Sequence, residues 1–150
     1  MQYTVRKVAL GDFFGLLEVE QEAFLGDGYS PYFIKMIPHL YPDTCFVAEA
    51  EGHIIAYSLG ARDGHDREVG WILTAAVKRG YQGHGIGTAV ATALVDAMGQ
   101  QQIKRLILTV EPSNPARELY RRHGFVETKF EEDCYGLGKA RYYMERRLAP

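Results

Sequence analysis

The segment Gly80-Tyr-Gln-Gly-His-Gly-Ile-Gly87 constrains the fold more than any other part of this chain. It follows residues 69–77, which are nearly continuously apolar as in a central strand, and it precedes a helical pattern. A helix N-terminus leaves about four N–H groups unpaired and carries about half a positive charge, so it attracts anions. Glycines let a phosphate approach such groups and supply the backbone angles that turn them inward. The segment therefore predicts main-chain binding of a pyrophosphate, and the simpler alternative is a tight strand-to-helix turn.

Two common nucleotide-binding motifs match this segment poorly. A Walker A loop needs Lys and then Ser or Thr after its last glycine, whereas Gly87 is followed by Thr88 and Ala89. A dinucleotide-binding fold places its glycines after an early strand and an acidic residue at the end of the next strand. Here the glycines lie in mid-chain and position 109 is Thr. A nucleotide-binding regulatory domain is kept as an alternative that preferential binding of ATP or NAD would reveal.

Apolar periodicity over the rest of the chain predicts a mixed α/β domain. Three consecutive strand patterns, two of them joined in a hairpin at Glu51-Gly52, imply antiparallel pairing. A strand, a helix and a strand over residues 69–110 imply a parallel crossover. Asp12 and Asn114 are predicted helix caps, with Pro115 in the first helical position. The expected elements are a strand at 3–8, helices at 13–24 and 32–40, strands at 45–49, 54–59 and 69–77, a helix at 86–98, a strand at 106–110, a helix at 116–123, and strands at 125–131 and 141–148.

Length and composition fit one domain over residues 1–150 and argue against several classes of protein. Of the 150 residues, 47% are hydrophobic and 24% charged, which are ordinary globular values. The net charge of -2 argues against a general nucleic-acid binder. No apolar run approaches the ~18 residues of a membrane span and no signal-peptide pattern is present, so we expect a cytoplasmic protein. Cys45 and Cys134 predict neither a disulfide framework, nor a metal site, nor a cysteine nucleophile.

The glycine loop and a second segment together resemble a known family. Gln82-Gly83-His84-Gly85-Ile86-Gly87 matches Q/R-x-x-G-x-G/A, the acetyl-CoA loop of the GNAT superfamily of N-acetyltransferases. The segment NPARELYRRHGF, from Asn114 to Phe125, resembles the second motif of that family, and the resemblance covers essentially the whole chain. It implies a GNAT-like α/β fold. This fold has one central, mostly antiparallel twisted sheet of about seven strands, a parallel splayed pair at the acetyl-CoA site and about four flanking helices.

The resemblance also implies which residues bind acetyl-CoA. The strand before the loop would pair its backbone with the pantetheine arm, loop N–H groups would hold the pyrophosphate, and an N–H near Ala75 or Ala76 would hold the oxyanion. Asn114 would bind the pantetheine from the far side, but it lies one residue closer to Tyr120 than in many relatives. Ser113 could therefore take the asparagine position, and Asn114 could be only a helix cap. The implied cofactor-binding residues are Ala75, Ala76, Val77, Gln82, Gly83, His84, Gly85, Ile86, Gly87, Thr88, Asn114 and Tyr120.

Amine attack on a thioester expels a thiolate, which needs a proton. The resemblance gives this role to Tyr120, since a phenol with a pKa of about 10 is protonated at neutral pH, and the alternative is a core tyrosine. The candidate general bases are Glu111 and Glu68. Some relatives carry a glutamate where this chain has Thr109, and Glu111 follows two residues later on the same strand face. Both acids could equally be solvated surface groups, with water relaying the proton from the amine.

The resemblance implies an acetyltransferase that moves an acetyl group from acetyl-CoA directly to a primary amine, without a metal. The acceptor would be a protein or peptide N-terminus, or else a small-molecule amine, and the aromatic stretch 29–41 could select it or simply pack the core. Arg117, Arg121 and Arg122 could meet the 3′-phosphate of coenzyme A or form a solvated face. A non-catalytic acyl-CoA-binding regulatory module is the alternative from another class. The expected partners are acetyl-CoA and the amine, with no nucleic acid or membrane, and a homodimer is left open.

Overall fold

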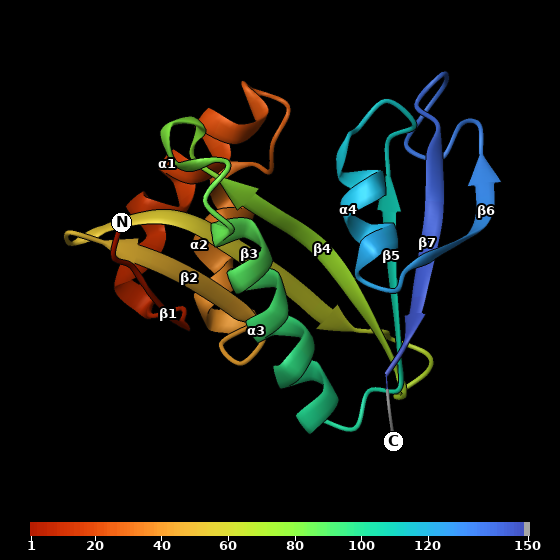
Figure 1. Cartoon of the computed structure of the whole chain (residues 1–150), viewed down its shortest axis with the longest axis horizontal. Helices are drawn as coiled ribbons and strands as arrows, with labels where there is room; N and C mark the ends of the chain where they lie inside the picture. Colours follow the sequence, from red (N-terminus) through yellow and green to blue (C-terminus); the bar gives the residue numbers. More distant parts are fainter. Residues whose placement is uncertain (149–150) are drawn as a thin grey trace. The chain divides into compact units, whose positions relative to one another are not determined.

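The computed structural model describes residues 1–148, and this part of the chain divides into two compact units (Figure 1). The first unit combines Met1–Ala61 with Thr74–Gln101, and the second combines Arg62–Leu73 with the chain from Gln102 onward. Hydrogen-bonded neighbours give a sheet of seven strands in the order β1-β2-β3-β4-β5-β7-β6, and β4 contributes residues to both units. The prediction of a mixed α/β fold with one mostly antiparallel sheet is confirmed.

The first unit is built from three antiparallel strands, the end of a fourth strand and three helices. Its β2–β3 hairpin turns at Glu51 and Gly52, which both have positive φ, as the turn pattern predicts. The elements are β1 (Thr4–Lys7), α1 (Phe13–Phe24), α2 (Pro31–Leu40), β2 (Cys45–Ala50), β3 (His53–Arg62), the second half of β4 (Val69–Val77) and α3 (Ile86–Gln100).

Successive residues of β2 and β3 face two different helical layers, because side chains alternate across a strand. Val47 and Tyr57 lie opposite each other in the cluster that contains buried side chains of α1 and α2. Their neighbours Ala48 and Ala56 also lie opposite each other, but in the cluster that includes α3. Figure 1 shows α3 crossing one face of these strands, with α1 and α2 on the other. Burial on both faces fixes the strand register, since a slip of one residue would exchange the two sets of side chains.

The second unit is built on the start of β4 and three further strands. Val69–Trp71 of β4 pair in parallel with Arg105–Ile107 of β5, which confirms the predicted crossover. β5 also pairs antiparallel with β7, and β7 pairs antiparallel with β6. Leu106 of β5 and Met144 of β7 are both fully buried. The elements after β4 are β5 (Arg105–Val110), α4 (Ala116–Arg122), β6 (Val126–Glu131) and β7 (Arg141–Arg147).

The N-terminus of α1 differs from the sequence prediction. Asp12 directly precedes the helix, but its carboxylate accepts hydrogen bonds from Arg6 and from the N–H of Ala9 and does not cap α1. Asp12 ends a short 3-10 turn, Leu10–Asp12, and a second such turn, Arg79–Tyr81, follows β4. Neither turn was predicted, because three residues are too few to show an apolar period.

Candidate active site

The glycine segment turns from β4 into α3 with left-handed backbone at two glycines. Gly83 has a φ of 83° and Gly85 a φ of 77°, values that favour glycine. A Cβ at either position would meet no other protein atom within 4 Å. Backbone conformation, rather than crowding, therefore requires glycine at both positions. Gly87 differs, because a Cβ there would lie 3.2 Å from Cγ2 of Val77.

The N-terminus of α3 is suited to bind an anion. None of the side chains in residues 1–148 caps it, and the N–H groups of its first turn have no intrahelical acceptors. With 15 residues, α3 is long enough to develop a helix dipole whose positive end lies here. The Gln82 side chain donates from Nε2 to the carbonyl oxygen of Val77, 3.2 Å away, and steadies the turn. His84 and Thr88 border the same turn, so the segment fits a pyrophosphate in conformation and in charge.

Ala75, Ala76 and Val77 form the end of β4 directly before this turn. Ala76 is buried in the cluster that contains α1 and α2, whereas Val77 packs against the cluster that contains α3. Their side chains thus anchor the strand on both faces. A ligand running along this part of β4 would meet its main-chain N–H and C=O groups, which is the contact that the family resemblance implies for a pantetheine arm.

Tyr120 lies in α4, within the second unit. Its ring is half-buried and packs edge-on against Phe125, with the ring centroids 5.8 Å apart. Burial raises the pKa of the Tyr120 phenol. Because burial disfavours the phenolate, this hydroxyl keeps its proton to a higher pH than a free tyrosine does.

Asn114 makes a hydrogen bond to the start of α4, where Pro115 and not Asn114 occupies the cap position. The first helical residue is Ala116 instead of Pro115, and the Asn114 side chain accepts a hydrogen bond from the N–H of Ala116, 2.9 Å away. The prediction that Asn114 is the cap residue is therefore wrong by one position, although its Oδ1 atom accepts one hydrogen bond from the helix. A ligand would have to use the amide nitrogen of Asn114 or the exposed hydroxyl of Ser113.

The two candidate bases lie at opposite ends of β5. The carbonyl oxygen of Glu68 accepts hydrogen bonds from Lys104 and Arg105, where β5 begins, and its carboxylate lies 3.1 Å from the Lys104 ammonium. Glu111 directly follows the last residue of β5, and its carboxylate lies 3.0 Å from the Arg141 guanidinium. The strand rises about 3.3 Å per residue, so about 20 Å of β5 separates them. A single active site can therefore use only one of these two carboxylates as its general base.

The arginines of α4 are bound within the second unit. Arg117 and Arg121 both pair with Glu127 of β6, Arg117 at 2.8 Å, and the Arg117 guanidinium also lies over the ring of Tyr142. The hydrogen bond from Arg117 lowers the pKa of Glu127. Arg122 is exposed. These contacts give Arg117 and Arg121 a structural role that a phosphate would have to displace.

A buried carboxylate in α1 escaped the sequence analysis. Glu20 is only 2% exposed, and it accepts a hydrogen bond from the hydroxyl of Tyr57 and another, of 2.7 Å, from the N–H of Tyr29. Burial raises the pKa of Tyr57, and the Glu20 charge raises it further. Glu20 and Tyr57 are 37 positions apart, and a glutamate within an amphipathic helix normally faces water. Only the folded chain reveals the contact.

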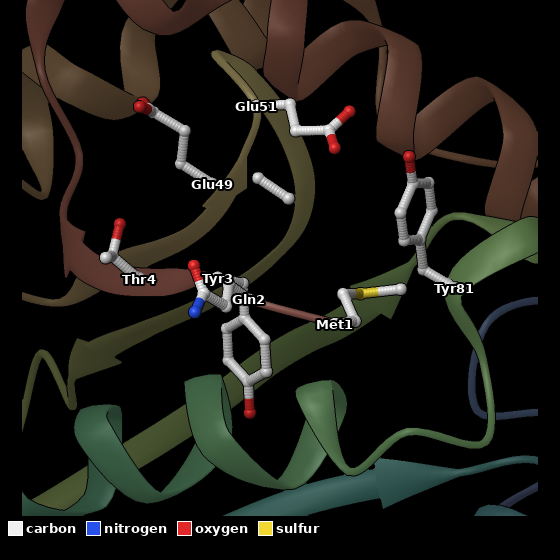
Figure 2. Close-up of a pocket in the computed structure, with 8 residues that line it drawn as sticks. Met1, Gln2, Tyr3, Thr4, Glu49, Glu51 and Tyr81 are labelled. Carbon is white, nitrogen blue, oxygen red and sulfur yellow. The ribbon is translucent and has the colours of Figure 1, made fainter.

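A cavity near the N-terminus also has no counterpart in the sequence analysis. It measures about 1040 Å³ and is lined by residues 1–4 and 49–51 and by Tyr81. Figure 2 shows Met1 beside Tyr81, and Glu49 and Glu51 on the β2–β3 hairpin at the same cavity. Glu49 is paired with Arg6 at 2.8 Å, and Tyr81 belongs to the glycine segment as well, so the cavity borders that segment.

Residues 1–148 give no support to a metal site, a membrane-spanning helix or a cysteine nucleophile. In this part of the chain, no group of three or more His, Cys, Asp or Glu side chains could hold a metal ion. None of its helices is long and apolar enough to cross a membrane. Burial raises the pKa of the Cys45 thiol to about 12, which keeps it from being a thiolate at neutral pH.

Comparison with known sequences gives consistent matches. The model of the Acetyltransferase (GNAT) family matches residues 13–125. An uncharacterized N-acetyltransferase of Methanocaldococcus jannaschii is 31% identical over 148 residues, which cover 95% of this chain and 90% of that protein. An N-alpha-acetyltransferase of Sulfurisphaera tokodaii is 30% identical over 160 residues, which cover 98% of this chain and 94% of that protein. An L-2,4-diaminobutyric acid acetyltransferase of Nocardia farcinica is 26% identical over 112 residues, which cover 75% of this chain and 58% of that protein.

Solved structures share the fold. Ard1 from Thermoplasma volcanium superposes with a TM-score of 0.89 at 22% identity, over 100% of both chains. A chain of the NatC complex bound to Gag peptide and CoA superposes with a TM-score of 0.87 at 21% identity, over 99% of this chain and 100% of that one. At these identities the likeness concerns the fold alone, and it confirms the arrangement of strands and helices implied by the sequence resemblance.

Proposed function

Because this chain belongs to the GNAT family of acetyltransferases, we propose that it moves an acetyl group from acetyl-CoA to the α-amino group of a protein or peptide N-terminus. Family membership supplies acetyl transfer to an amine. The choice of acceptor is carried by one observation, the match to an N-alpha-acetyltransferase over 98% of this chain and 94% of the relative. A non-catalytic acyl-CoA-binding module is not favoured, since the relatives are named as acetyltransferases.

A small-molecule amine is the second candidate acceptor. It is favoured by the diaminobutyric acid acetyltransferase, although that match covers 75% of this chain and 58% of the relative. The lower identity, 26% against 30%, and the shorter match rank it behind a peptide N-terminus.

Acetyl-CoA would supply a thioester as acyl donor and a thiolate as leaving group. We propose that residues 82–88 hold its pyrophosphate through main-chain N–H groups at the start of α3, supported by the open, left-handed glycines. Ala75–Val77 would bind the pantetheine arm by backbone pairing, and an N–H of Ala75 or Ala76 would donate to the oxygen that gains negative charge. Asn114 or Ser113 would complete the cofactor-binding set.

Tyr120 is the proposed general acid. Its role is to donate the phenolic proton to the sulfur as the thiolate leaves, and support comes from its raised pKa, which keeps the phenol protonated. The acid must afterwards recover a proton from solvent or from the amine.

For the general base we propose Glu111 in preference to Glu68, because it lies at the end of β5 that leads into Asn114 and α4. The Arg141 guanidinium, 3.0 Å away, orients its carboxylate. We expect Glu111→Gln to lower kcat at neutral pH by a factor that shrinks as the pH nears the pKa of the amine, because a neutral amine needs no base. Rates measured against pH test this. A larger loss in Glu68→Gln would exchange the two roles.

A panel of amines tests the proposed acceptor. Wild-type protein and acetyl-CoA would be mixed with peptides that have free N-termini, the same peptides with blocked N-termini, and small amines including L-2,4-diaminobutyric acid. Free thiol release should be fastest with one of the free peptides and absent with its blocked form. Faster release with a small amine would favour the second acceptor class, and no release with any amine would overturn the proposed transfer.

We further propose that the chain forms one acetyltransferase domain and acts in the cytoplasm, as a monomer or a homodimer. The family match over residues 13–125 supports a single domain. Light scattering on the purified protein determines the assembly, and a fluorescent fusion determines the location.

A further inference from the structure

Glu111 and Arg141 face each other where the ladder between β5 and β7 ends. The last pair of this antiparallel ladder is Val110 opposite Tyr142, and Figure 1 shows the two strands side by side. One residue further, the same register places Glu111 opposite Arg141, the first residue of β7. Arg141 Nη1 lies 3.0 Å from Glu111 Oε1. Opposite charges that lie opposite each other across two strands attract, so this ion pair follows from the strand register.

The Arg141 side chain is also held from a second direction, by Tyr135. Its guanidinium lies over the Tyr135 ring, 4.4 Å from the ring centroid, and only 18% of the side chain is exposed. Tyr135 is itself fixed, since its hydroxyl shares a hydrogen bond with the Thr109 hydroxyl and its N–H donates to the Lys139 carbonyl oxygen at 3.2 Å. A planar guanidinium stacks well on an aromatic ring. Arg141 is therefore held in place independently of Glu111.

Glu111 supplies the only ion pair that Arg141 forms within residues 1–148. Glu131 of β6 lies opposite Arg141 in the neighbouring ladder, but its carboxylate lies 3.2 Å from the Lys129 ammonium. Burial lowers the pKa of Arg141, because a cation that has lost water is less stable, although arginine stays charged at neutral pH. The Glu111 carboxylate is thus the group that compensates a partly desolvated positive charge.

Glu111 turns one carboxylate oxygen toward Arg141 and leaves the other open. Its main chain is fixed, because its carbonyl oxygen accepts from the N–H of Asn114 at 3.0 Å and because Pro112 restricts the backbone of the residue before it. In the part of the chain that the structure describes, Oε2 has no ion pair and no hydrogen bond, and 59% of the side chain is exposed. An exposed glutamate otherwise moves among several rotamers. The contact with Arg141 therefore determines where the open oxygen lies.

We infer that Arg141 is a positioning residue for deprotonation of the acceptor amine: it holds Glu111 so that the open oxygen, Oε2, faces the ammonium group. This role rests on the proposed function, since it takes Glu111 as the general base. One proton passes from the amine nitrogen to Oε2, the nitrogen lone pair becomes free to attack the thioester carbonyl carbon, and Glu111 later returns the proton to water. Arg141 touches no reacting atom and acts only through Glu111, and Tyr135 acts through Arg141.

A double-mutant cycle separates this role from a structural one. Its members are Glu111→Gln, Arg141→Met and the double variant, because methionine keeps much of the apolar packing against Tyr135 but removes the charge. Arg141→Lys keeps the charge and is the conservative variant. Arg105→Met is the matched control, since it breaks another ion pair of β5 and β7, in which Arg105 lies 2.6 Å from Glu145 at the other end of β5.

Steady-state kinetics would use acetyl-CoA and the free peptide that the wild type acetylates fastest. Arg141→Met should lower kcat at neutral pH by about tenfold, a part of the factor of about a hundred or more that a positioned base contributes. The KM for the peptide and the stabilisation by acetyl-CoA should not change. In the Glu111→Gln background, Arg141→Met should have no further effect on kcat, because the base that it positions is already absent. Arg141→Lys should retain more activity than Arg141→Met, and Arg105→Met should match the wild type.

Two results would overturn the role of Arg141. A wild-type kcat in Arg141→Met would show that Glu111 needs no positioning, and an equal loss with and without Glu111 would show that Arg141 acts on the structure in general. If Arg141→Met did not fold, Tyr135→Leu would take its place in the cycle, because position 135 is exposed and the change removes only the ring beside the guanidinium. Tyr135→Leu should lower kcat by about threefold, again only when Glu111 is present.

Failure of the proposed function gives a different result. If the wild type acetylated the peptide but Glu111→Gln had the same kcat, the assignment of the base would fail, and the role of Arg141 with it, while acetyl transfer itself would stand. If the wild type released no thiol with any amine, the proposed transfer would be wrong.

Discussion

At the scale of single residues, the proposed role of Tyr120 as general acid can be tested most directly. We expect Tyr120→Phe to lower kcat by about a hundredfold or more, the usual contribution of a general acid. The variant should still be stabilised by acetyl-CoA, because the ring and its packing on Phe125 remain. Since burial raises the pKa of Tyr120, the wild-type rate should not fall through loss of this proton as the pH rises from neutral to about 10.

Thiol release against pH, with acetyl-CoA binding followed by melting temperature, measures both effects. Tyr3→Phe is the matched control, because Tyr3 is another half-buried tyrosine and packs against the α3 cluster of the first unit. A variant at position 120 with near wild-type kcat would exclude the phenol as the acid. Equal losses in the two variants would indicate a general effect of removing a tyrosine hydroxyl.

Asp63 provides a second test at this scale. Trp71 Nε1 donates to its carboxylate at 2.7 Å, and this bond, with two backbone N–H groups, lowers the pKa of Asp63 from 3.8 to about 2. A carboxyl whose pKa is lower in the folded state stabilises the fold above its ordinary pKa, and this contribution is lost as the pH falls through the lowered value. We therefore expect the melting temperature of the wild type to fall more than that of Asp63→Asn between about pH 4 and about pH 2.

Trp71 is the single tryptophan, so its fluorescence follows this unfolding directly. Parallel melting curves for wild type and Asp63→Asn over the same acid range would show that Asp63 is not linked to folding in this way.

Local sequence patterns led to the hypotheses for the glycine segment and, through the family resemblance, for Tyr120, because their chemistry depends on residue type and local position. They did not identify Glu20, because the partners Tyr29 and Tyr57 lie nine and 37 positions away. They also left Glu68 and Glu111 as equal candidates, since their separation along β5 appears only when the strands are paired. Contacts distant in sequence depend on the tertiary fold, and a single sequence does not specify them.

At the scale of elements, the start of α3 carries the cofactor hypothesis. Gly85→Ala should cost about 1 kcal/mol in the free protein, because alanine is strained at its left-handed φ. It should also raise the Kd for acetyl-CoA, since the turn must shift and a Cβ would enter the space left for phosphate. Melting curves and ligand titration measure the two effects.

Gly80→Ala is the control in the same segment, because its Cβ meets no atom within 4 Å and its φ is not positive. It should behave as the wild type in both measurements. If Gly85→Ala bound acetyl-CoA with wild-type affinity, the glycine turn would be a connection between β4 and α3 and nothing more.

The sequence predicted which segments are helices and which are strands more accurately than it predicted where each of them begins and ends. The strand expected at residues 69–77 is observed as Val69–Val77, because polar and glycine residues border a continuous apolar run. α2 starts at Pro31, one residue before the predicted start, and ends at Leu40 as predicted, although Pro38 lies within it. The order of the strands in the sheet was not predicted, because it depends on pairings between residues distant in sequence.

At the scale of the whole molecule, ligand binding should appear as stability. Acetyl-CoA at a hundred times its Kd should add about 2.7 kcal/mol to the free energy of unfolding. For a chain of 150 residues this raises the melting temperature by several degrees. Coenzyme A should act similarly, and ATP and NAD should act less. A larger shift with ATP or NAD would point to a nucleotide-binding domain instead.

The most direct test of acetyl transfer to a peptide N-terminus is to locate the acetyl group on a product. Purified protein, acetyl-CoA and a peptide with both a free N-terminus and an internal lysine would be analysed by fragmentation mass spectrometry, with free thiol counted in parallel. We expect one acetyl group on the N-terminal nitrogen for each thiol released. Acetylation of the lysine alone, or thiol release without an acetylated peptide, would contradict the proposal.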